Sequence, residues 1–304
     1  MQKKYIGIIG TILVVVSLFC HTHQPVVNIA YMADTKYLPY VMTSLHSAIV
    51  NKKEKTHYKI HIIAKDFTPQ DIEKIKQMTG KNIEINIYSA QKLNLDFSHL
   101  GRFSSFQVAL QKLFIAQYLQ NVNKVLYLDA DTLVQTDLAD VYQTNLKEKY
   151  AAAVKDGLMY QYPEHITELN LKNKDFYFNS GVMLLNLDKI RQDNIMQKAI
   201  IYFNTHSEIF GDQDVLNVVF KDKVQSLSYR YNCNSVFFEE KDAAFLSSFW
   251  QENVPENPEQ VYKTAAILHF AGHKPWTEWF KHPYLKSLWQ KYAKETQAKY
   301  SIDF

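Results

Sequence analysis

The feature that most constrains this chain is the alternation of short apolar runs with helix-spaced segments between residues 28 and 128. The runs at Asn28–Met32, Tyr58–Ala64 and Ile83–Tyr88 are short and apolar, and the second and third alternate as strands do. Lys124–Leu128 (KVLYL) is a continuous apolar run, as expected of a strand buried on both faces. This order predicts an α/β fold with a mostly parallel central sheet, flanking helices and a single catalytic domain.

Helical spacing of apolar residues separates these runs. The predicted helices are Tyr37–Val50, a helix capped at Thr68 that runs to about Thr79, and a helix from Ser104 or Ser105 to Gln120. By contrast, residues 241–263 are polar and contain Pro255 and Pro258, so we expect a long surface loop there.

Composition excludes several classes of protein. The chain has only eight glycines and no GxGxxG, GxxxxGKS or GxxxxGKT pattern, which argues against a Rossmann dinucleotide site or a P-loop. The net charge of +3 is too balanced for a dedicated nucleic-acid binder. Two cysteines, Cys20 and Cys233, cannot form a disulfide framework. The function must therefore be sought in particular motifs.

Residues 1–25 form a separate segment. Lys3 and Lys4 precede an uncharged apolar run, Tyr5–Cys20, and no A-x-A cleavage pattern follows it. The run is slightly short for a spanning helix of ~20 residues and slightly long for a signal-peptide core of ~7–15 residues. We therefore expect a single-pass N-terminal signal-anchor, with a cleaved signal peptide or a buried helix as the alternatives.

Two carboxylates follow the most hydrophobic predicted strand, in Asp129-Ala130-Asp131. Residues i and i+2 of a strand point to the same side, so both can reach one divalent cation. Oxygen ligands favour Mg²⁺ or Mn²⁺. The pattern is weak by itself, because Asp212-Gln213-Asp214 repeats it, and a pair of turn or N-cap aspartates is the alternative interpretation.

A histidine follows a second apolar run, Ala265–Leu268, and opens the stretch HFAGHKPW. His269 would suit a metal ligand, and Lys274 would suit a cation that binds phosphate beside it. Gly272 would allow the backbone to approach the ligand closely. A structural histidine and a solvated lysine are the alternative. The glycines that lie in candidate motifs are Gly181, Gly211 and Gly272.

Five stretches in order resemble the retaining, GT-A-type glycosyltransferases of family 8, which include lipopolysaccharide galactosyl- and glucosyltransferases, glycogenin and xylosyltransferases. The stretches are Asn28–Tyr37, Lys124–Val134, Phe178–Leu187, Gly211–Asn217 and His269–Trp276. The resemblance implies a Rossmann-like GT-A catalytic domain at residues 26–276. It also implies a UDP-sugar donor, Mn²⁺ or Mg²⁺ as the metal, and a glycan, lipid-glycan or protein-glycan acceptor.

The resemblance also assigns roles to residues. The metal ligands would be Asp129, Asp131 and His269. Asp34 would contact the uracil of the donor. Asn179 and Ser180 would lie at its ribose and sugar. The diphosphate would be bound by Asp129, Ala130, Asp131, Gly272 and Lys274. The catalytic set would be Asp212 on the sugar hydroxyls, Gln213 beneath the anomeric carbon, and Lys112 on the donor, with Asp156 on the acceptor side. Lys112 stands where relatives often carry arginine, so glucose, galactose and xylose all remain open.

The resemblance leaves two mechanisms open for a transferase. Gln213 is a poor nucleophile, which favours front-face attack in which an oxygen of the leaving diphosphate takes the proton of the acceptor. Asp212 keeps a double displacement open.

Two other functions are alternatives to a transferase. KVLYLDADTLV also resembles the first motif of haloacid-dehalogenase-type phosphohydrolases, with Asp129 as nucleophile and Asp131 as general acid and base. The other alternative function is that of a non-catalytic, carbohydrate-binding relative.

Residues 277–304 are rich in lysine and aromatic residues at helical spacing, although Pro283 interrupts the pattern. We expect an amphipathic C-terminal helix that packs on its own domain, with an anionic membrane surface as the alternative. UDP-sugars occur in the cytosol and the Golgi lumen. An anchored domain would therefore face the Golgi or secretory lumen in a eukaryote and be membrane-associated on the cytoplasmic side in a bacterium. The sequence does not specify the oligomeric state.

Overall fold

A computed structural model of the protein describes residues 24–90, 108–157, 162–171, 176–206, 211–234 and 242–304. The strands are β1 (Val26–Asp34), β2 (His57–Lys65), β3 (Ile83–Ser89), β4 (Lys124–Leu128), β5 (Thr132–Val134), β6 (Ala151–Lys155), β7 (Phe178–Asn186), β8 (Val224–Ser226) and β9 (Ile267–His269). The α-helices are α1 (Leu38–Val50), α2 (Pro69–Lys76), α3 (Ile115–Tyr118), α4 (Ala139–Tyr142), α5 (Pro163–Glu168), α6 (Leu187–Gln192), α7 (Ile195–Thr205), α8 (Asp212–Val219), α10 (Ala243–Trp250), α11 (Pro258–Thr264) and α12 (Pro283–Tyr300). The 3₁₀ helices are η1 (Thr35–Tyr37), η3 (Ala109–Phe114) and η5 (Tyr229–Tyr231).

In the described part of the chain, seven strands form the central sheet, in the order β3-β2-β1-β4-β7-β6-β8, and β5 pairs with β9 in a second, two-stranded sheet. β1 lies parallel to β2 and β4, β2 to β3, and β6 to β8. β7 runs antiparallel to both β4 and β6. The predicted mostly parallel sheet of a single domain is confirmed, with β7 as the reversed strand.

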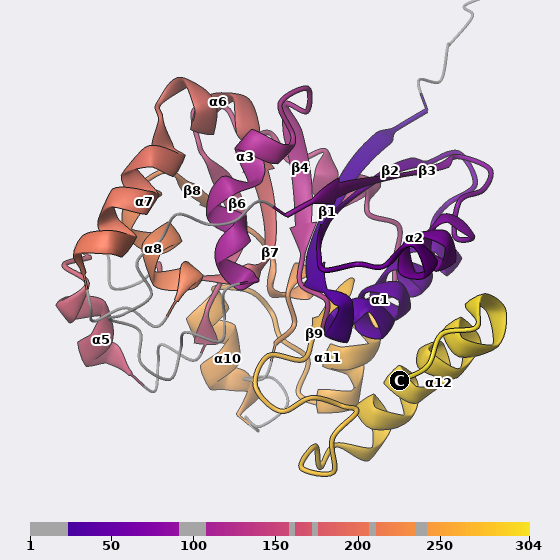
Figure 1. Ribbon diagram of the computed structural model, residues 1–304. Helices are drawn as coiled ribbons and strands as arrows, with labels where there is room; N and C mark the ends of the chain where they lie inside the picture. Colours follow the sequence, from indigo (N-terminus) through magenta and orange to yellow (C-terminus); the bar gives the residue numbers. More distant parts are fainter. Residues whose placement is uncertain (1–23, 91–107, 158–161, 172–175, 207–210, 235–241) are drawn as a thin grey trace, which may run out of the picture.

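Helices cover both faces of the central sheet (Figure 1). The alternation along β4 shows why, since Leu126 and Leu128 join a core with α1, α11 and α12, whereas Val125 and Tyr127 join one with α6, α7 and α8. Because both faces are apolar, a helix layer on each side is needed to bury them. The carboxyl ends of β1 and β4 meet at one edge, where α/β sheets bind ligands.

The predicted loop at 241–263 is wrong, since this stretch contains α10 and α11. Asp242 caps α10 by accepting from the backbone N–H groups of residues 244 and 245. Asn257 caps α11, and Pro258 occupies its first position. Leu246 and Trp250 are buried one turn apart, so a largely polar sequence still carries an apolar stripe.

Two other predicted helices differ in extent. The helix expected to end near Thr79 ends at Lys76. In its described part, the helix expected to run to Gln120 is the 3₁₀ helix η3 followed by the single turn of α3. Its predicted start at Ser104 or Ser105 lies outside the described residues. Lys112 lies in η3, which is wound more tightly than an α-helix, and its side chain points into the site described below.

The C-terminal helix α12 begins at Pro283, which is favourable at the first helical position rather than an interruption. Leu285 and Trp289 are buried on one face, and α12 packs against α1. The predicted anchor at residues 1–25 falls outside the described part of the chain except for its last two residues. Within the described part, no helix has both the length and the apolarity to cross a bilayer.

Candidate active site

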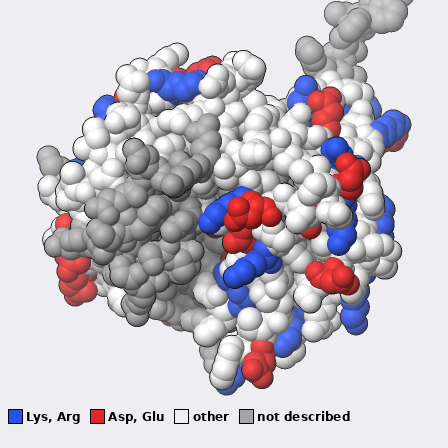
Figure 2. All heavy atoms as spheres, in the orientation of Figure 1, with Lys and Arg blue, Asp and Glu red and all other residues white. Residues whose placement is uncertain are grey.

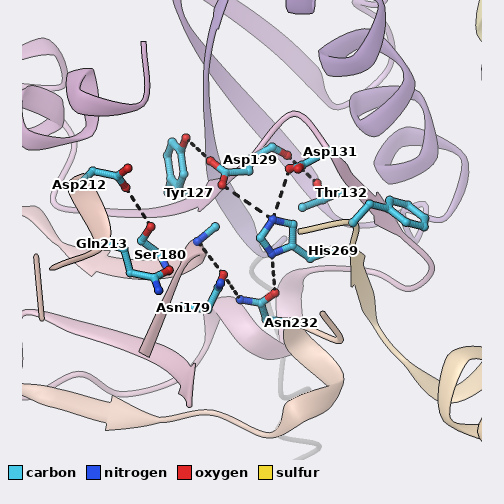
Figure 3. Close-up of polar contacts among 12 residues, drawn as sticks. Tyr127, Asp129, Asp131, Thr132, Asn179, Ser180, Asp212, Gln213, Asn232 and His269 are labelled. Atoms are coloured by element: carbon cyan, nitrogen blue, oxygen red, sulfur yellow. Dashed lines mark hydrogen bonds and ion pairs between the residues drawn. The ribbon is translucent and has the colours of Figure 1, made fainter. Parts of the chain in front are cut away.

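Three side chains converge where β4, β5 and β9 meet (Figure 3). Asp129 follows β4, Asp131 precedes β5, and His269 ends β9, which pairs with β5. His269 Nε2 lies 3.3 Å from Asp131 Oδ1 and 3.8 Å from Asp129 Oδ2. One ligand atom from each residue lies within 4.8 Å of the others. Two carboxylates and an imidazole nitrogen form a donor set that can hold a divalent cation.

Lys274 lies beside these ligands, in the loop that follows β9. Its ammonium contacts Asp131 and donates to the carbonyl of Phe270 at 2.9 Å. Burial alone would lower the pKa of Lys274, but Asp131 raises it above its ordinary value. Burial alone would raise the pKa of Asp131, but Lys274 and His269 hold it well below its usual range. The site therefore holds charges of both signs in close contact.

A second, buried cation lies on the other side of Asp129. Lys112 Nζ is 3.1 Å from Asp129 Oδ1 and 2.9 Å from Asp212 Oδ2, and the Lys112 side chain is 4% exposed. Burial alone would lower the pKa of Lys112, but Asp129 and Asp212 raise it above its ordinary value. Lys112 thus joins the end of β4 to the start of α8. Figure 2 shows acidic and basic side chains lying together near the centre of one face of the molecule.

The start of α8 brings the predicted catalytic pair against β7. Gly211, with a φ of 123°, precedes the helix in a conformation that favours glycine. Asp212 Oδ2 accepts from Ser180 Oγ at 2.9 Å, and Gln213 Oε1 accepts from Ser180 N at 3.0 Å. The predicted sugar-contacting residues therefore meet at one point.

Asp156, predicted on the acceptor side, is 3% exposed and lies behind this pair. Its Oδ2 accepts from Gln213 Nε2 at 2.8 Å and from Asn179 Nδ2 at 3.1 Å. The structure thus gives Asp156 a role in orienting two amides.

The predicted uracil contact, Asp34, ends β1 and caps η1 by accepting from Tyr37 N at 3.1 Å. Burial raises the pKa of Tyr37, and the charges of Lys274 and Asp131 also act on it. Tyr37, in η1, is therefore near enough to the acidic pair and Lys274 to feel their charges. Ala130, between the two aspartates, is buried, and Gly272 has a φ of 81° in the loop that carries Lys274.

Sequence reasoning missed two residues. Tyr127 donates its hydroxyl to Asp129 Oδ1 at 2.6 Å, and its ring lies 4.9 Å from Lys112 Nζ. The Oδ1 atom of Asn232 lies 2.9 Å from the Nδ1 atom of His269. Tyr127 could have been found, since it lies two residues before Asp129 on the same side of β4. For Asn232, no local pattern signals the contact.

Comparison with known proteins identifies the family. The chain is 26% identical to General stress protein A of Bacillus subtilis over 274 residues, or 85% of this chain and 90% of that one. It is 26% identical to the lipopolysaccharide 1,2-glucosyltransferase of Escherichia coli over 264 residues, or 83% and 74% of the two chains. The solved structure of the galactosyltransferase LgtC with donor and acceptor sugar analogs matches 88% of this chain and 95% of that one, with 21% identity and a TM-score of 0.65.

That structural match supports the GT-A fold. The phosphohydrolase alternative, which rested on KVLYLDADTLV alone, gains no support from these comparisons. Residues 28–280 match the family model described as "Glycosyl transferase family 8", and the chain therefore belongs to glycosyltransferase family 8.

Proposed function

We propose that this glycosyltransferase transfers glucose, galactose or xylose from a UDP-sugar to a glycan, lipid-linked glycan or protein glycan, with retention of configuration and dependence on Mn²⁺. The observation that carries this proposal is the convergence of Asp129, Asp131 and His269 with a lysine beside them. A divalent cation held there would stabilise the negative charge that develops on the departing diphosphate. Relatives that act on sugars, such as the lipopolysaccharide 1,2-glucosyltransferase, support the substrate class.

Lys274 supplies a protein cation for the same charge. Its ammonium is held at the rim of the acidic pair by Asp131 and by the Phe270 carbonyl. Such a preorganised cation stabilises an anionic leaving group without reorganisation during the reaction. We assign Lys274 to the diphosphate. We assign the half-buried Asp34 at the end of β1 and the exposed Tyr37 in η1 to the nucleoside.

The surroundings of the sugar favour front-face attack. Asp212 is bound by Lys112 and by Ser180, so its negative charge is already compensated and its nucleophilicity is reduced. Gln213 offers only an amide. Asp214, the next carboxylate on α8, is fully buried against His165 and Tyr177. We therefore propose that a leaving diphosphate oxygen accepts the acceptor's proton.

The test is UDP release by the purified full-length chain from UDP-glucose, UDP-galactose and UDP-xylose, with Mn²⁺ and with EDTA. The Asp131→Ala variant should lose activity, whereas the Asp140→Ala variant, which changes an aspartate with a 68% exposed side chain, should retain it. Metal-dependent turnover of one donor would identify the sugar. Phosphate release from p-nitrophenyl phosphate without UDP release would instead favour the phosphohydrolase.

We also propose that residues 1–25 anchor the catalytic domain of residues 26–276 in a membrane. The support is the uncharged run Tyr5–Cys20 behind Lys3 and Lys4. Full-length protein should stay with membranes after an alkaline carbonate wash, and a variant lacking residues 1–25 should be released. Release of the full-length protein would contradict the anchor. Protease treatment of sealed vesicles would show on which side of the membrane the catalytic domain lies, because only a domain inside the vesicles is protected.

A further inference from the structure

We propose that Asn232 positions the ring of His269. The orientation of Asn232 is in turn fixed by hydrogen bonds that run through Asn179 to Asp156. Together these bonds decide which imidazole nitrogen of His269 carries the proton and which faces the acidic pair, Asp129 and Asp131. We call Asp156, Asn179, Asn232 and His269 the amide chain. The inference rests on the proposed function, because it concerns the same metal site.

The amide chain joins four separate elements of the fold. Asn232 follows η5 and is fully buried. Its Oδ1 lies 2.9 Å from His269 Nδ1, and its Nδ2 donates to Asn179 Oδ1 at 2.9 Å (Figure 3). Asn179, on β7, donates through Nδ2 to Oδ2 of Asp156 at 3.1 Å, and Asp156 directly follows β6.

Chemistry fixes the direction of this series. The carboxylate of Asp156 accepts, so it receives the NH₂ group of Asn179. The backbone N–H of Gly181 can only donate, and it lies 2.9 Å from Asn179 Oδ1. Both contacts therefore place the amide oxygen of Asn179 toward Asn232, which must present its own NH₂ group in return. The two ends of the Asn179 amide are thus constrained independently.

The orientation of Asn232 then sets the protonation of the histidine ring. Because Asn232 turns its oxygen toward His269, the Nδ1 atom must carry the proton that is donated. Nε2 faces Asp129 and Asp131 and is the atom available to a metal. His269 is 3% exposed, so solvent water has little access to replace this hydrogen bond.

The same carboxylate orients the proposed catalytic amide. Gln213 donates through Nε2 to Asp156 Oδ2 and accepts through Oε1 from Ser180 N. Asp156 therefore constrains both the metal ligand, through the amide chain, and Gln213 directly. A partner that holds the second nitrogen of a ligating histidine typically contributes 10–100-fold to metal affinity.

The first experiment measures Mn²⁺ binding by electron paramagnetic resonance in the presence of UDP, for the wild type and three variants. Asn232→Leu and Asn232→Ala remove the acceptor and should bind Mn²⁺ roughly 10–100-fold more weakly. Asn232→Asp keeps an oxygen that accepts from Nδ1–H but loses the NH₂ group that donates to Asn179 Oδ1, so it should bind more weakly than the wild type and more tightly than the other two variants. The nitrogen modulation of His269 in electron spin-echo spectra should follow the same order.

The matched control is Asn28→Leu, which removes the amide beside a different histidine, since Asn28 Oδ1 lies 3.1 Å from His61 Nε2. This variant should lose stability and keep Mn²⁺ affinity. Mn²⁺ binding by folded Asn232→Leu or Asn232→Ala at wild-type strength would overturn the proposal. Failure of the wild type to bind Mn²⁺ at all would count against the proposed function itself.

A second measurement needs no folded variant of Asn232. Wild-type protein with ¹⁵N-labelled histidine is studied by NMR with UDP and Mg²⁺, which is diamagnetic, and the His269 signals are assigned by their absence in His269→Gln. We expect a proton on Nδ1 that exchanges slowly with water. A His269 ring protonated only at Nε2 would overturn the proposal.

Discussion

A Cβ atom on Gly181 would overlap Cε1 of His269 and lie 2.9 Å from Oδ2 of Asp129. Gly181 does not have a positive φ, so backbone conformation does not explain the glycine at this position. The reason is space, because β7 passes directly behind two of the proposed metal ligands. The strand is buried along this stretch and has little room to move away.

Gly181→Ala should therefore displace the His269 ring. We expect Mn²⁺ affinity to fall roughly 10–100-fold, as for loss of a ligand's supporting contact, and stability to fall by about 1–3 kcal/mol from overpacking. Gly80→Ala is the control, because the nearest atom to its added Cβ is 4.0 Å away. Equal Mn²⁺ affinity in the two variants, measured by titration, would contradict the steric explanation.

Lys112→Met should destabilise the protein by about 3 kcal/mol or more, because it leaves the Asp129 and Asp212 carboxylates without their buried cation. Urea unfolding monitored by circular dichroism, without added metal, measures this change. Lys59→Met is the matched control, since its partner Glu84 is half-exposed and the pair should contribute little. A similar small effect for both variants would show that the Lys112 pairs do not hold the fold together.

Stability should depend on pH through His165, a buried histidine that lies between the buried Asp214 and the exposed Glu168. Its Nε2 lies 2.9 Å from Asp214 Oδ2, and its Nδ1 lies 3.4 Å from Glu168 Oε2. Burial alone would lower the pKa of His165, but Asp214 and Glu168 raise it above its ordinary value. A raised pKa in the folded state stabilises the fold below the unfolded value of about 6.5, and this stabilisation is lost as pH rises through the folded value.

The difference in unfolding free energy between wild type and His165→Gln should therefore be larger at pH 6 than at pH 9. Taking the difference removes the opposite effects of His46 and His61, whose pKa values burial lowers. A difference that is constant with pH would mean that His165 does not titrate between these values.

The C-terminal helix offers a matched pair of leucines. Leu285 is fully buried, whereas Leu288, three residues later on α12, is only partly buried. Leu285→Ala should cost about 2–5 kcal/mol of unfolding free energy, and Leu288→Ala clearly less. Equal, small losses would indicate that α12 contributes little to the core.

Local patterns allowed much of the fold to be predicted. The strands near residues 28, 58, 83 and 124 were placed within a few residues, because apolar runs and their spacing reflect burial directly. The helices α10 and α11 were missed, because caps at Asp242 and Asn257 and a narrow apolar stripe form helices in sequence that reads as polar. For α12, sequence patterning left packing and membrane binding both open, and burial of Leu285 and Trp289 favours packing.

The site divides in the same way. By itself, the sequence determined that two carboxylates follow the most apolar strand and that a histidine and a lysine follow another, because each motif is a few residues long. Only the tertiary structure decided that Lys112 lies between Asp129 and Asp212, that Asp156 lies behind Gln213, and that Asn232 holds His269. These contacts join residues 17 to 100 positions apart, and they depend on the order of the strands in the sheet. Short local motifs do not specify that order, which is set when the strands assemble into one sheet between helix layers.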